Sequence, residues 1–154
     1  MSTSKAPSRR VLVVDDNEDD VLLLSLSLRH AGLPWTMVGA APDGEQAIDY
    51  LKTMAGANGE SSDAIDLLLL DLKMPRRTGF DVLEWVRSNM PGRFKIVVFS
   101  SSFVTADIKR ARQLGANFYH VKPVSSEARK QILLELEAIL GPPVRRGAMV
   151  TTAA

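Results

Sequence analysis

Several short apolar runs in this sequence end on residues that can hold a metal or transfer a phosphoryl group. Those residues are Asp15 and Asp16, Asp71, Ser100 and Ser101, and Lys122. Carboxylates that face one another at short range repel, and a hard cation such as Mg²⁺, which prefers an octahedron of oxygens, relieves that repulsion. A carboxylate nucleophile, a metal, a cationic amine and a hydroxyl donor around one point would form a site for phosphoryl transfer.

Each of these residues also has an ordinary structural explanation. An Asp that follows a buried strand commonly caps a helix or forms a turn, and for Asp16 alone this explanation stays open. A Lys before a Pro is usually a solvated loop residue, and two consecutive Ser after a strand commonly form a turn. Because the residues follow four different apolar runs of the chain, their joint placement favours a shared metal or phosphate site.

The elements that would position these residues are five apolar runs, each of a length that suits one strand. The apolar residues are mostly continuous rather than alternating, which is typical of strands buried on both faces of a parallel sheet. The runs cover residues 10–14, 35–41, 65–70, 95–99 and 117–121. Ligands of such sheets bind outside the carboxyl ends of the strands, which is where the polar residues lie.

Helical patterns, with apolar residues at three- and four-residue spacing, lie between and after these runs. The expected helices begin at Asn17 or Asp16, Asp43 or Gly44, Thr78 or Gly79, Thr105, and Ser125 or Ser126. The residues expected to face inward are Val21, Leu24 and Leu28; Ala47, Ile48 and Leu51; Phe80, Leu83 and Val86; Ile108, Ala111 and Arg112; and Ala128, Ile132, Leu136 and Ile139. Strands that alternate with helices predict an α/β fold with helices on both faces of the sheet.

Length, charge and composition narrow the class of protein. The chain has 154 residues, a net charge of +1 and no Cys. The length favours one domain, the charge gives no pull toward nucleic acid or membrane, and the lack of Cys excludes disulfides and Cys-based zinc sites in this sequence. No apolar run approaches the ~20 residues of a membrane span, and the first ten residues lack the apolar core of a signal peptide. We therefore expect a cytoplasmic protein.

The segment boundaries follow from the same patterns. We expect a flexible lead over residues 1–8, one domain over residues 9–140 and a flexible tail over residues 141–154. Residues 55–64 are expected to form a polar loop.

Four segments resemble the receiver domain of response regulators, the CheY-like domain of bacterial two-component systems. The resemblance covers roughly residues 9–140. The segments are VLVVDDNEDD (11–20), LLLLDLKMPRRTGFDVL (67–83), VVFSSS (97–102) and LGANFYHVKPV (114–124). The resemblance implies a flavodoxin-like, doubly wound, five-stranded parallel sheet in the order 2-1-3-4-5.

The resemblance also implies a metal site and a phosphoacceptor. Asp71 would accept the phosphoryl group. Asp15, Asp16 and Asp71 would hold Mg²⁺, Asp16 more directly than Asp15, with the backbone carbonyl of Lys73 as a further ligand. Lys122 would pair with the phosphoryl group.

Three more residues have implied roles in switching or in the turn beside the site. Ser100 matches the hydroxyl residue that moves toward the phosphoryl group, and Tyr119 matches the aromatic switch that rotates inward. The peptide bond before Pro123 is expected to be cis.

The departures from the family pattern are small. Ser100 stands where Thr is commoner, and Ser101 is small, as phosphate access requires. Lys73 and Ser102 occupy positions that tune the hydrolysis rate. The long loop at residues 55–64 and the run of three Ser most resemble the stand-alone subgroup paired with bacterial phytochromes.

The resemblance implies a single-domain response regulator that catalyses only its own phosphoryl transfer and dephosphorylation. Its expected partners are a sensor histidine kinase, a bacteriophytochrome if the subgroup assignment holds, and a downstream target or phosphotransfer protein. Too few residues follow Leu140 for an output domain, so we expect output through protein contacts, including a homodimer through the fourth helix, fifth strand and fifth helix. Nucleic acid and membranes are not expected partners.

Alternatives remain for the function and for single residues. A receiver-like scaffold could act without phosphorylation, although the complete set of polar residues argues against it. A metal-dependent phosphatase would need a second Asp two residues after Asp71, where Lys73 stands. Tyr119 could simply pack on the sheet. The acidic residues 18–20 could complement a helix dipole, and Phe80, Trp85 and Phe99 are expected in the core.

Overall fold

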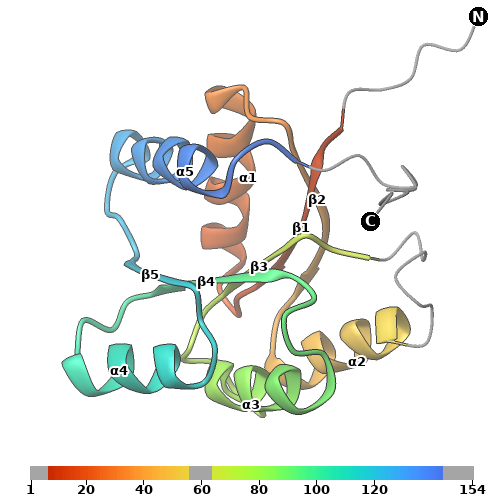
Figure 1. Cartoon of the computed structure of the whole chain (residues 1–154). Coiled ribbons are helices and arrows are strands. Elements are labelled where there is room, and N and C mark those ends of the chain that lie inside the picture. Colours follow the sequence, from red (N-terminus) through yellow and green to blue (C-terminus); the bar gives the residue numbers. More distant parts are fainter. Residues whose placement is uncertain (1–6, 56–63, 144–154) are drawn as a thin grey trace, which may run out of the picture.

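The computed structural model of the chain describes residues 7–55 and 64–143. Five parallel strands form one sheet in the order β2-β1-β3-β4-β5, as predicted (Figure 1). The strands are β1 (Arg9–Val14), β2 (Trp35–Ala41), β3 (Leu67–Leu70), β4 (Lys95–Ser100) and β5 (Phe118–Val121). Most of the expected flexible lead and tail, and the centre of the expected polar loop, lie outside the described residues.

Five helices alternate with the strands. They are α1 (Glu18–Ala31), α2 (Gly44–Ala55), α3 (Gly79–Asn89), α4 (Thr105–Gln113) and α5 (Ser126–Leu140). Side chains cap four of them as the sequence predicts. Asn17 accepts from two backbone N–H groups of α1, Asp43 accepts from the backbone N–H of Gln46 in α2, Thr78 forms a capping box with Asp81, and Ser125 accepts from the backbone of Ala128. These caps determine the residue at which each helix begins after the loop that follows a strand.

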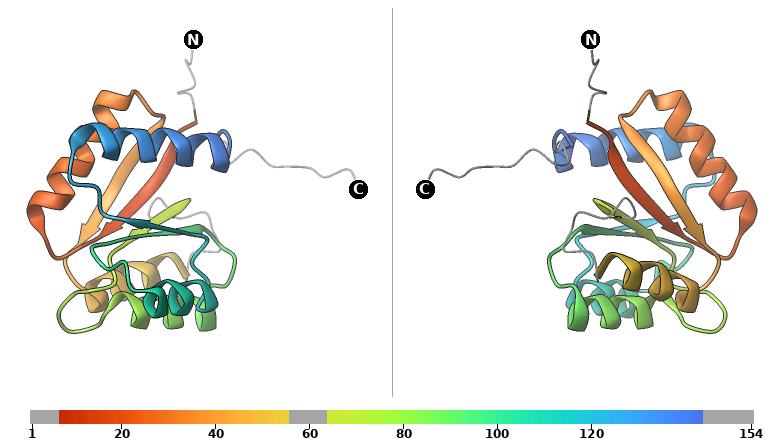
Figure 2. Two further views of the ribbon diagram at one scale, coloured as in Figure 1. Left: turned by 90° about the vertical axis from the view of Figure 1, so that its left-hand side faces the viewer. Right: turned by 90° about the vertical axis from the view of Figure 1, so that its right-hand side faces the viewer.

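The helices cover both faces of the sheet, with α1 and α5 on one face and α2, α3 and α4 on the other (Figures 1 and 2). Successive strand residues point to opposite faces, so each strand contributes to two packed cores. Val11, Val13 and Leu69 pack with α1 and α5. Leu12 and Leu68 pack with α2, α3 and α4. Burial on both faces is the physical reason for the continuous apolar runs, and it confirms the doubly wound α/β fold.

The inward face of α5 differs from the sequence prediction. Ile139 was expected to face the core but is 62% exposed, whereas Leu133 is fully buried. Ala128 is also exposed. The buried stripe runs through Leu133 and Leu136, which is rotated around the helix from the predicted stripe. A helix with apolar residues on more than one face leaves this rotation to be set by packing.

Two smaller differences concern the face of α2, α3 and α4. Arg112 of α4 was expected inward but is exposed, and Ala111 next to it is fully buried. Phe80 and Trp85 are only partly buried, at the edge of the core, whereas Phe99 is buried as expected. Among the described residues, none of the helices is long and apolar enough to cross a membrane.

Candidate functional site

The register of the sheet brings the predicted site residues to one edge. Val14 of β1 pairs with Leu70 of β3, so Asp15 and Asp71 leave the sheet at the same level. Ser100 of β4 pairs with Val121 of β5, and Lys122 follows at once. The backbone N–H of Asp71 donates to the carbonyl of Val14 at 2.9 Å, and that of Lys122 donates to the carbonyl of Ser100 at 2.8 Å. The backbone of Asp71 and that of Lys122 are therefore each fixed by a hydrogen bond to the neighbouring strand.

Three carboxylates gather at this edge. Asp15, Asp16 and Asp71 each offer one oxygen, and these oxygens lie within 4.8 Å of one another. Mg²⁺ binds oxygens at 2.0–2.1 Å, so opposite ligands of an octahedron are about 4 Å apart, and the three oxygens lie within a compatible limit of 4.8 Å. Asp71 is buried and Asp16 is exposed, which leaves one side of the cluster open for water or phosphate ligands. The donor set and its spacing therefore fit Mg²⁺.

Lys122 closes the other side of the cluster. Its Nζ lies 2.8 Å from Asp15 Oδ2, 2.8 Å from Asp20 Oδ2 and 3.2 Å from Asp71 Oδ2. An ammonium group has three N–H donors, and three carboxylates surround this one. Lys122 is therefore a point charge placed directly beside the Asp71 carboxylate.

Burial and neighbouring charges shift the pKa values of Asp71 and Lys122. Burial raises the pKa of Asp71 above its usual value, and the Asp15 charge adds to this, while Lys122 opposes it. Burial alone would lower the pKa of Lys122, but its contacts with Asp15, Asp20 and Asp71 outweigh burial and raise it. Lys122 is therefore cationic at neutral pH, beside a carboxylate that is costly to keep charged without a further cation.

A glycine contact positions the segment that follows Asp71. The backbone N–H of Gly79 donates to the carbonyl of Leu72 at 3.0 Å. A Cβ at Gly79 would lie 2.2 Å from the carbonyl oxygen of Asp71. The start of α3 therefore packs against the Asp71 backbone in a way that only glycine permits. The backbone N–H of Lys73 donates to Asp71 Oδ1 at 3.3 Å, which orients the carboxylate.

The hydroxyl residues Ser100 and Ser101 lie beside the carboxylate cluster, the first buried and the second exposed. Ser100 is fully buried, and its Oγ accepts from the backbone N–H of Ser102 at 3.2 Å. Ser101 is exposed and lines the acidic pocket together with Asp71 and Lys122. The Tyr119 hydroxyl donates to the carbonyl of Ser102 at 2.8 Å, so its ring reaches the loop that follows β4. Ser100 and Tyr119 therefore both contact the backbone of one residue in this loop.

The prediction for the peptide bond before Pro123 is wrong. We expected a cis bond, but the part of the chain that the structure describes contains no cis peptide bond, so this bond is trans. Trans is the intrinsically favoured isomer of a bond before proline, by about 0.5–1 kcal/mol. The role of the Lys73 carbonyl as a metal ligand stays a prediction.

Sequence reasoning missed the part that Asp20 plays in the cluster. Its charge was explained by the dipole of α1, but its carboxylate contacts Lys122. The signal that could have revealed it is its place in the first turn of a helix that starts at the site edge.

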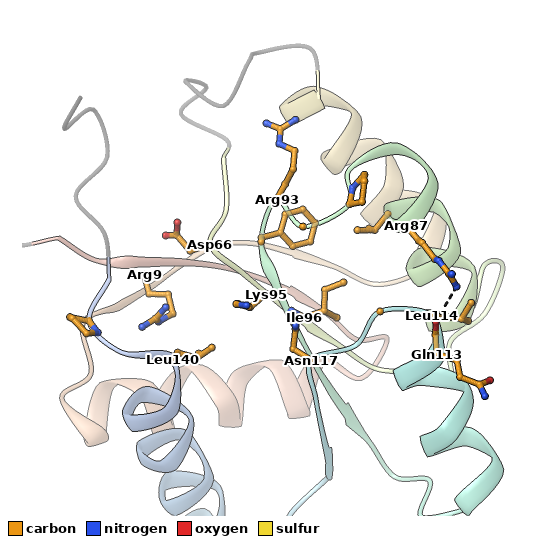
Figure 3. A pocket seen from close by; sticks show the side chains of 16 residues that line it. Arg9, Asp66, Arg87, Arg93, Lys95, Ile96, Gln113, Leu114, Asn117 and Leu140 are labelled. Carbon is orange, nitrogen blue, oxygen red and sulfur yellow. Dashed lines mark hydrogen bonds between the residues drawn. The ribbon is translucent and has the colours of Figure 1, made fainter. Parts of the chain in front are cut away.

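A second hollow lies at the opposite edge of the sheet, where the strands begin (Figure 3). This cavity has a volume of about 550 Å³, and Arg9, Asp66, Arg93 and Lys95 are among its lining residues. The open acidic pocket at the carboxyl edge has about 610 Å³. Four of the predicted site residues, Asp16, Asp71, Lys73 and Lys122, line the acidic pocket, whereas none of the predicted site residues lines the other cavity.

Comparison with known proteins identifies the family. The model of the response regulator receiver domain matches residues 11–134, which is most of the chain. The fold, the strand order and the acidic edge all agree with this match. The chain therefore belongs to the family of response regulator receiver domains, a class of domain used in two-component signalling.

Two full-length relatives of similar size support the assignment. The chain is 31% identical over 140 residues to the probable chemotaxis protein CheY of Rhizobium etli, covering 90% of this chain and 97% of that protein. It is 30% identical over 128 residues to the probable methanogenesis regulatory protein FilR2 of Methanothrix harundinacea, covering 82% and 80%. Other relatives are longer. The chain spans about half of the transcriptional regulatory protein PdtaR of Mycobacterium tuberculosis (34% identity, 78% of this chain, 52% of that protein).

Solved structures of a phytochrome response regulator and of a regulator in red light signalling are also similar. The phosphorylated cyanobacterial phytochrome response regulator RcpA superposes with a TM-score of 0.73 at 29% identity, covering 86% of this chain and 93% of that one. The response regulator RPA3017, in red light signalling of R. palustris, gives a TM-score of 0.74 at 26% identity, covering 89% and 99%. The resemblance to phytochrome-associated regulators noted in the sequence therefore extends to the fold.

Proposed function

We propose that this chain is a response regulator that accepts a phosphoryl group on Asp71 from a phosphohistidine of a sensor histidine kinase. The observation that carries the proposal is the contact of Lys122 Nζ with Asp71 Oδ2 at 3.2 Å, within a cluster that also contains Asp15 and Asp16. A buried carboxylate that is oriented by a backbone hydrogen bond, in a cluster that is open on one side, is suited to act as a nucleophile.

The chemistry follows from the groups around Asp71. A carboxylate oxygen of Asp71 attacks the phosphorus, the bond from phosphorus to the histidine nitrogen breaks, and the electron pair returns to the imidazole. The Lys122 ammonium donates a hydrogen bond to an oxygen of the transferred group. Mg²⁺, held by Asp15, Asp16, Asp71 and the Lys73 carbonyl, would neutralise charge that develops on the phosphoryl oxygens. Apart from this self-modification and its reversal, we propose no enzymatic activity.

Phosphorylation would change the conformation of the loop after β4, and this change would carry the signal away from the site. The buried Ser100 hydroxyl, which accepts from the Ser102 backbone N–H, would donate its own O–H to a phosphoryl oxygen. Because Tyr119 contacts the carbonyl of Ser102, movement of the loop changes the packing of this ring. The phosphoryl group then acts by favouring one of two packings of α4, β5 and α5. This differential binding is what a downstream protein would recognise.

The similarity to RcpA and RPA3017 supports a phytochrome-type histidine kinase as the partner. Both structures belong to regulators whose names connect them with light signalling. A downstream target or phosphotransfer protein would receive the signal. We do not propose nucleic acid or a membrane as partners.

A mobility-shift gel that retards phosphoproteins tests the acceptor. After incubation with acetyl phosphate and Mg²⁺, the wild-type chain should shift and Asp71→Asn should not. Asp66→Asn is the matched control, because Asp66 lies just before β3 whereas Asp71 lies just after it. It should shift like the wild type. An unshifted wild-type band would favour the phosphorylation-independent scaffold, and a shifted Asp71→Asn band would refute the acceptor assignment.

A homodimer through α4, β5 and α5 is the form of output that sedimentation can test. Val121, at the end of β5, is 41% exposed, and Val124, in the loop between β5 and α5, is fully exposed. We expect the chain to gain a dimer when beryllofluoride and Mg²⁺ are added. Val124→Asp should remove that gain, and an unchanged wild-type profile would count against this output.

A further inference from the structure

Lys122 makes more ion pairs than the proposed phosphoryl transfer uses. Its Nζ lies within 3.2 Å of Asp15, Asp20 and Asp71. The three partners match the three N–H donors of an ammonium group. A phosphoryl oxygen can therefore receive a hydrogen bond from Lys122 only if one of the carboxylates gives up its own.

Solvent exposure indicates which carboxylate leaves. The side chain of Asp20 is 33% exposed, compared with 9% for Asp15 and 6% for Asp71. A carboxylate that loses its partner is stabilised by water only if water can reach it, so release costs least at Asp20. Asp20 also lies outside the group of three carboxylates that could share a metal.

Lys122 stays in place without Asp20. Asp15 and Asp71 still flank the ammonium, at 2.8 and 3.2 Å. The hydrogen bond from the Lys122 backbone to the carbonyl of Ser100 is independent of the side chain. Removal of Asp20 therefore frees a donor while the ammonium stays beside Asp71.

We propose that Asp20 competes with the phosphoryl group for the Lys122 ammonium, and so weakens the hold of the site on that group. The inference rests on the proposed function, because it concerns the same phosphoacceptor site. Asp20 is a positioning residue that acts through Lys122, and it lowers the population of the phosphorylated state at a given phosphodonor supply.

The test measures beryllofluoride binding in the presence of Mg²⁺ by fluorine NMR on the full chain. Asp20→Asn should bind beryllofluoride about fivefold more tightly than the wild type, the effect expected for loss of one partly exposed ion pair. The neutral amide competes less well than a carboxylate because charge-assisted hydrogen bonds are stronger. Asp20→Glu keeps the carboxylate and should return the affinity to within about twofold of the wild type.

Asp19→Asn is the matched control. Asp19 lies in the same helical turn and lines the same acidic pocket, whereas the acidic partners of Lys122 are Asp15, Asp20 and Asp71. It removes the same charge from the pocket, so an effect of the overall field alone would appear equally in both variants. We expect less than a twofold change in beryllofluoride affinity for Asp19→Asn.

Magnesium binding alone separates competition for Lys122 from an effect on the metal. Mg²⁺ affinity, measured without beryllofluoride from the shift of the thermal midpoint, should be the same for Asp20→Asn and Asp19→Asn. Equal gains in beryllofluoride affinity for the two variants, or weaker binding by Asp20→Asn, would overturn the inference. A wild-type chain that binds no beryllofluoride would instead overturn the proposed function on which the inference rests.

Discussion

At the carboxyl edge of the sheet, Lys122 contacts three carboxylates, whereas at the amino edge Arg9 forms an ion pair with Glu137. The Arg9–Glu137 pair is matched, in the sense that one cation faces one carboxylate. Trp35 donates its indole N–H to the same Glu137 carboxylate. The guanidinium of Arg9 also lies over the Trp35 ring, 5.8 Å from its centroid. The two edges therefore differ in charge balance more than in the number of charged groups.

The difference in charge balance indicates that the carboxyl edge binds ligands and that the ion pair at the amino edge stabilises the fold. Four carboxylates and one ammonium meet at the carboxyl edge, because Asp16 adds to the three partners of Lys122. Such a cluster favours a further cation, and it can exchange partners when an anionic group arrives. The partly buried Arg9–Glu137 pair has one charge of each sign and no such deficit, so its removal affects stability rather than ligand binding. The amino-edge cavity is hollow and partly basic (Figure 3), yet its buried charge is already neutralised.

The largest expected effect is on stability at the amino edge. Arg9→Met leaves Glu137 without its cationic partner and removes the contact with the Trp35 ring, so the free energy of unfolding should fall by about 3 kcal/mol. Urea unfolding measures this change. Beryllofluoride affinity should stay within about twofold of the wild type, because Arg9 lies at the other edge.

Arg93→Met is the control for that prediction. Arg93 lines the same cavity but is exposed, so its removal should change the free energy of unfolding by less than about 0.5 kcal/mol. A loss in Arg93→Met as large as that in Arg9→Met would show that the whole basic rim, and not the matched pair, stabilises this edge.

The next effect is on ligand binding at the carboxyl edge. Lys122→Met removes the charge-assisted hydrogen bond to the phosphoryl group, so beryllofluoride affinity in Mg²⁺ should fall about thirtyfold. Fluorine NMR reports the affinity. Lys95→Met is the matched control, since Lys95 begins β4 at the amino edge, and it should bind like the wild type. Equal losses in the two variants would contradict the division of roles between the edges.

The smallest effect is a pH dependence at Asp71. Burial raises its pKa in the folded state above the ordinary value of 3.8. The folded chain then binds the Asp71 proton more tightly than the unfolded chain does. The contribution of this proton to the free energy of unfolding is therefore complete below pH 3.8. It is lost as pH rises through the folded-state pKa. In metal-free buffer, Asp71→Asn, which cannot ionise, should gain stability relative to the wild type as pH rises from about 3 to 7.

Thermal unfolding at several pH values measures that relative gain. Asp66→Asn serves as the reference, because it removes a carboxylate at the amino edge of the sheet, away from Asp71. A stability difference between Asp71→Asn and the wild type that stays constant with pH would contradict the raised pKa of Asp71.

Much of the fold could be predicted because its signals are local. Asn17, Thr78 and Ser125 each cap a helix through bonds to backbone groups only two or three residues away. The strands could be recognised because burial on both faces requires continuous apolar residues. The convergence of Asp15, Asp71 and Lys122 could also be anticipated, since parallel strands that pair in register end at one edge.

The errors concern quantities that local patterns do not determine. Leu133 and Ile139 are both apolar residues of α5, and only contact with the sheet decides which of them is buried. The trans bond before Pro123 differs from its alternative by a small intrinsic free energy, so the surrounding chain determines it.

The sequence by itself determined the order of strands and helices, the edge at which the polar residues meet and the chemical types gathered there. Only the tertiary structure decided which of those residues touch. Asp20 and Lys122 are separated by 102 positions, and their contact depends on how the first turn of α1 packs beside the end of β5. Packing between distant elements sets such distances to within an ångström, and no short-range pattern in the chain encodes them.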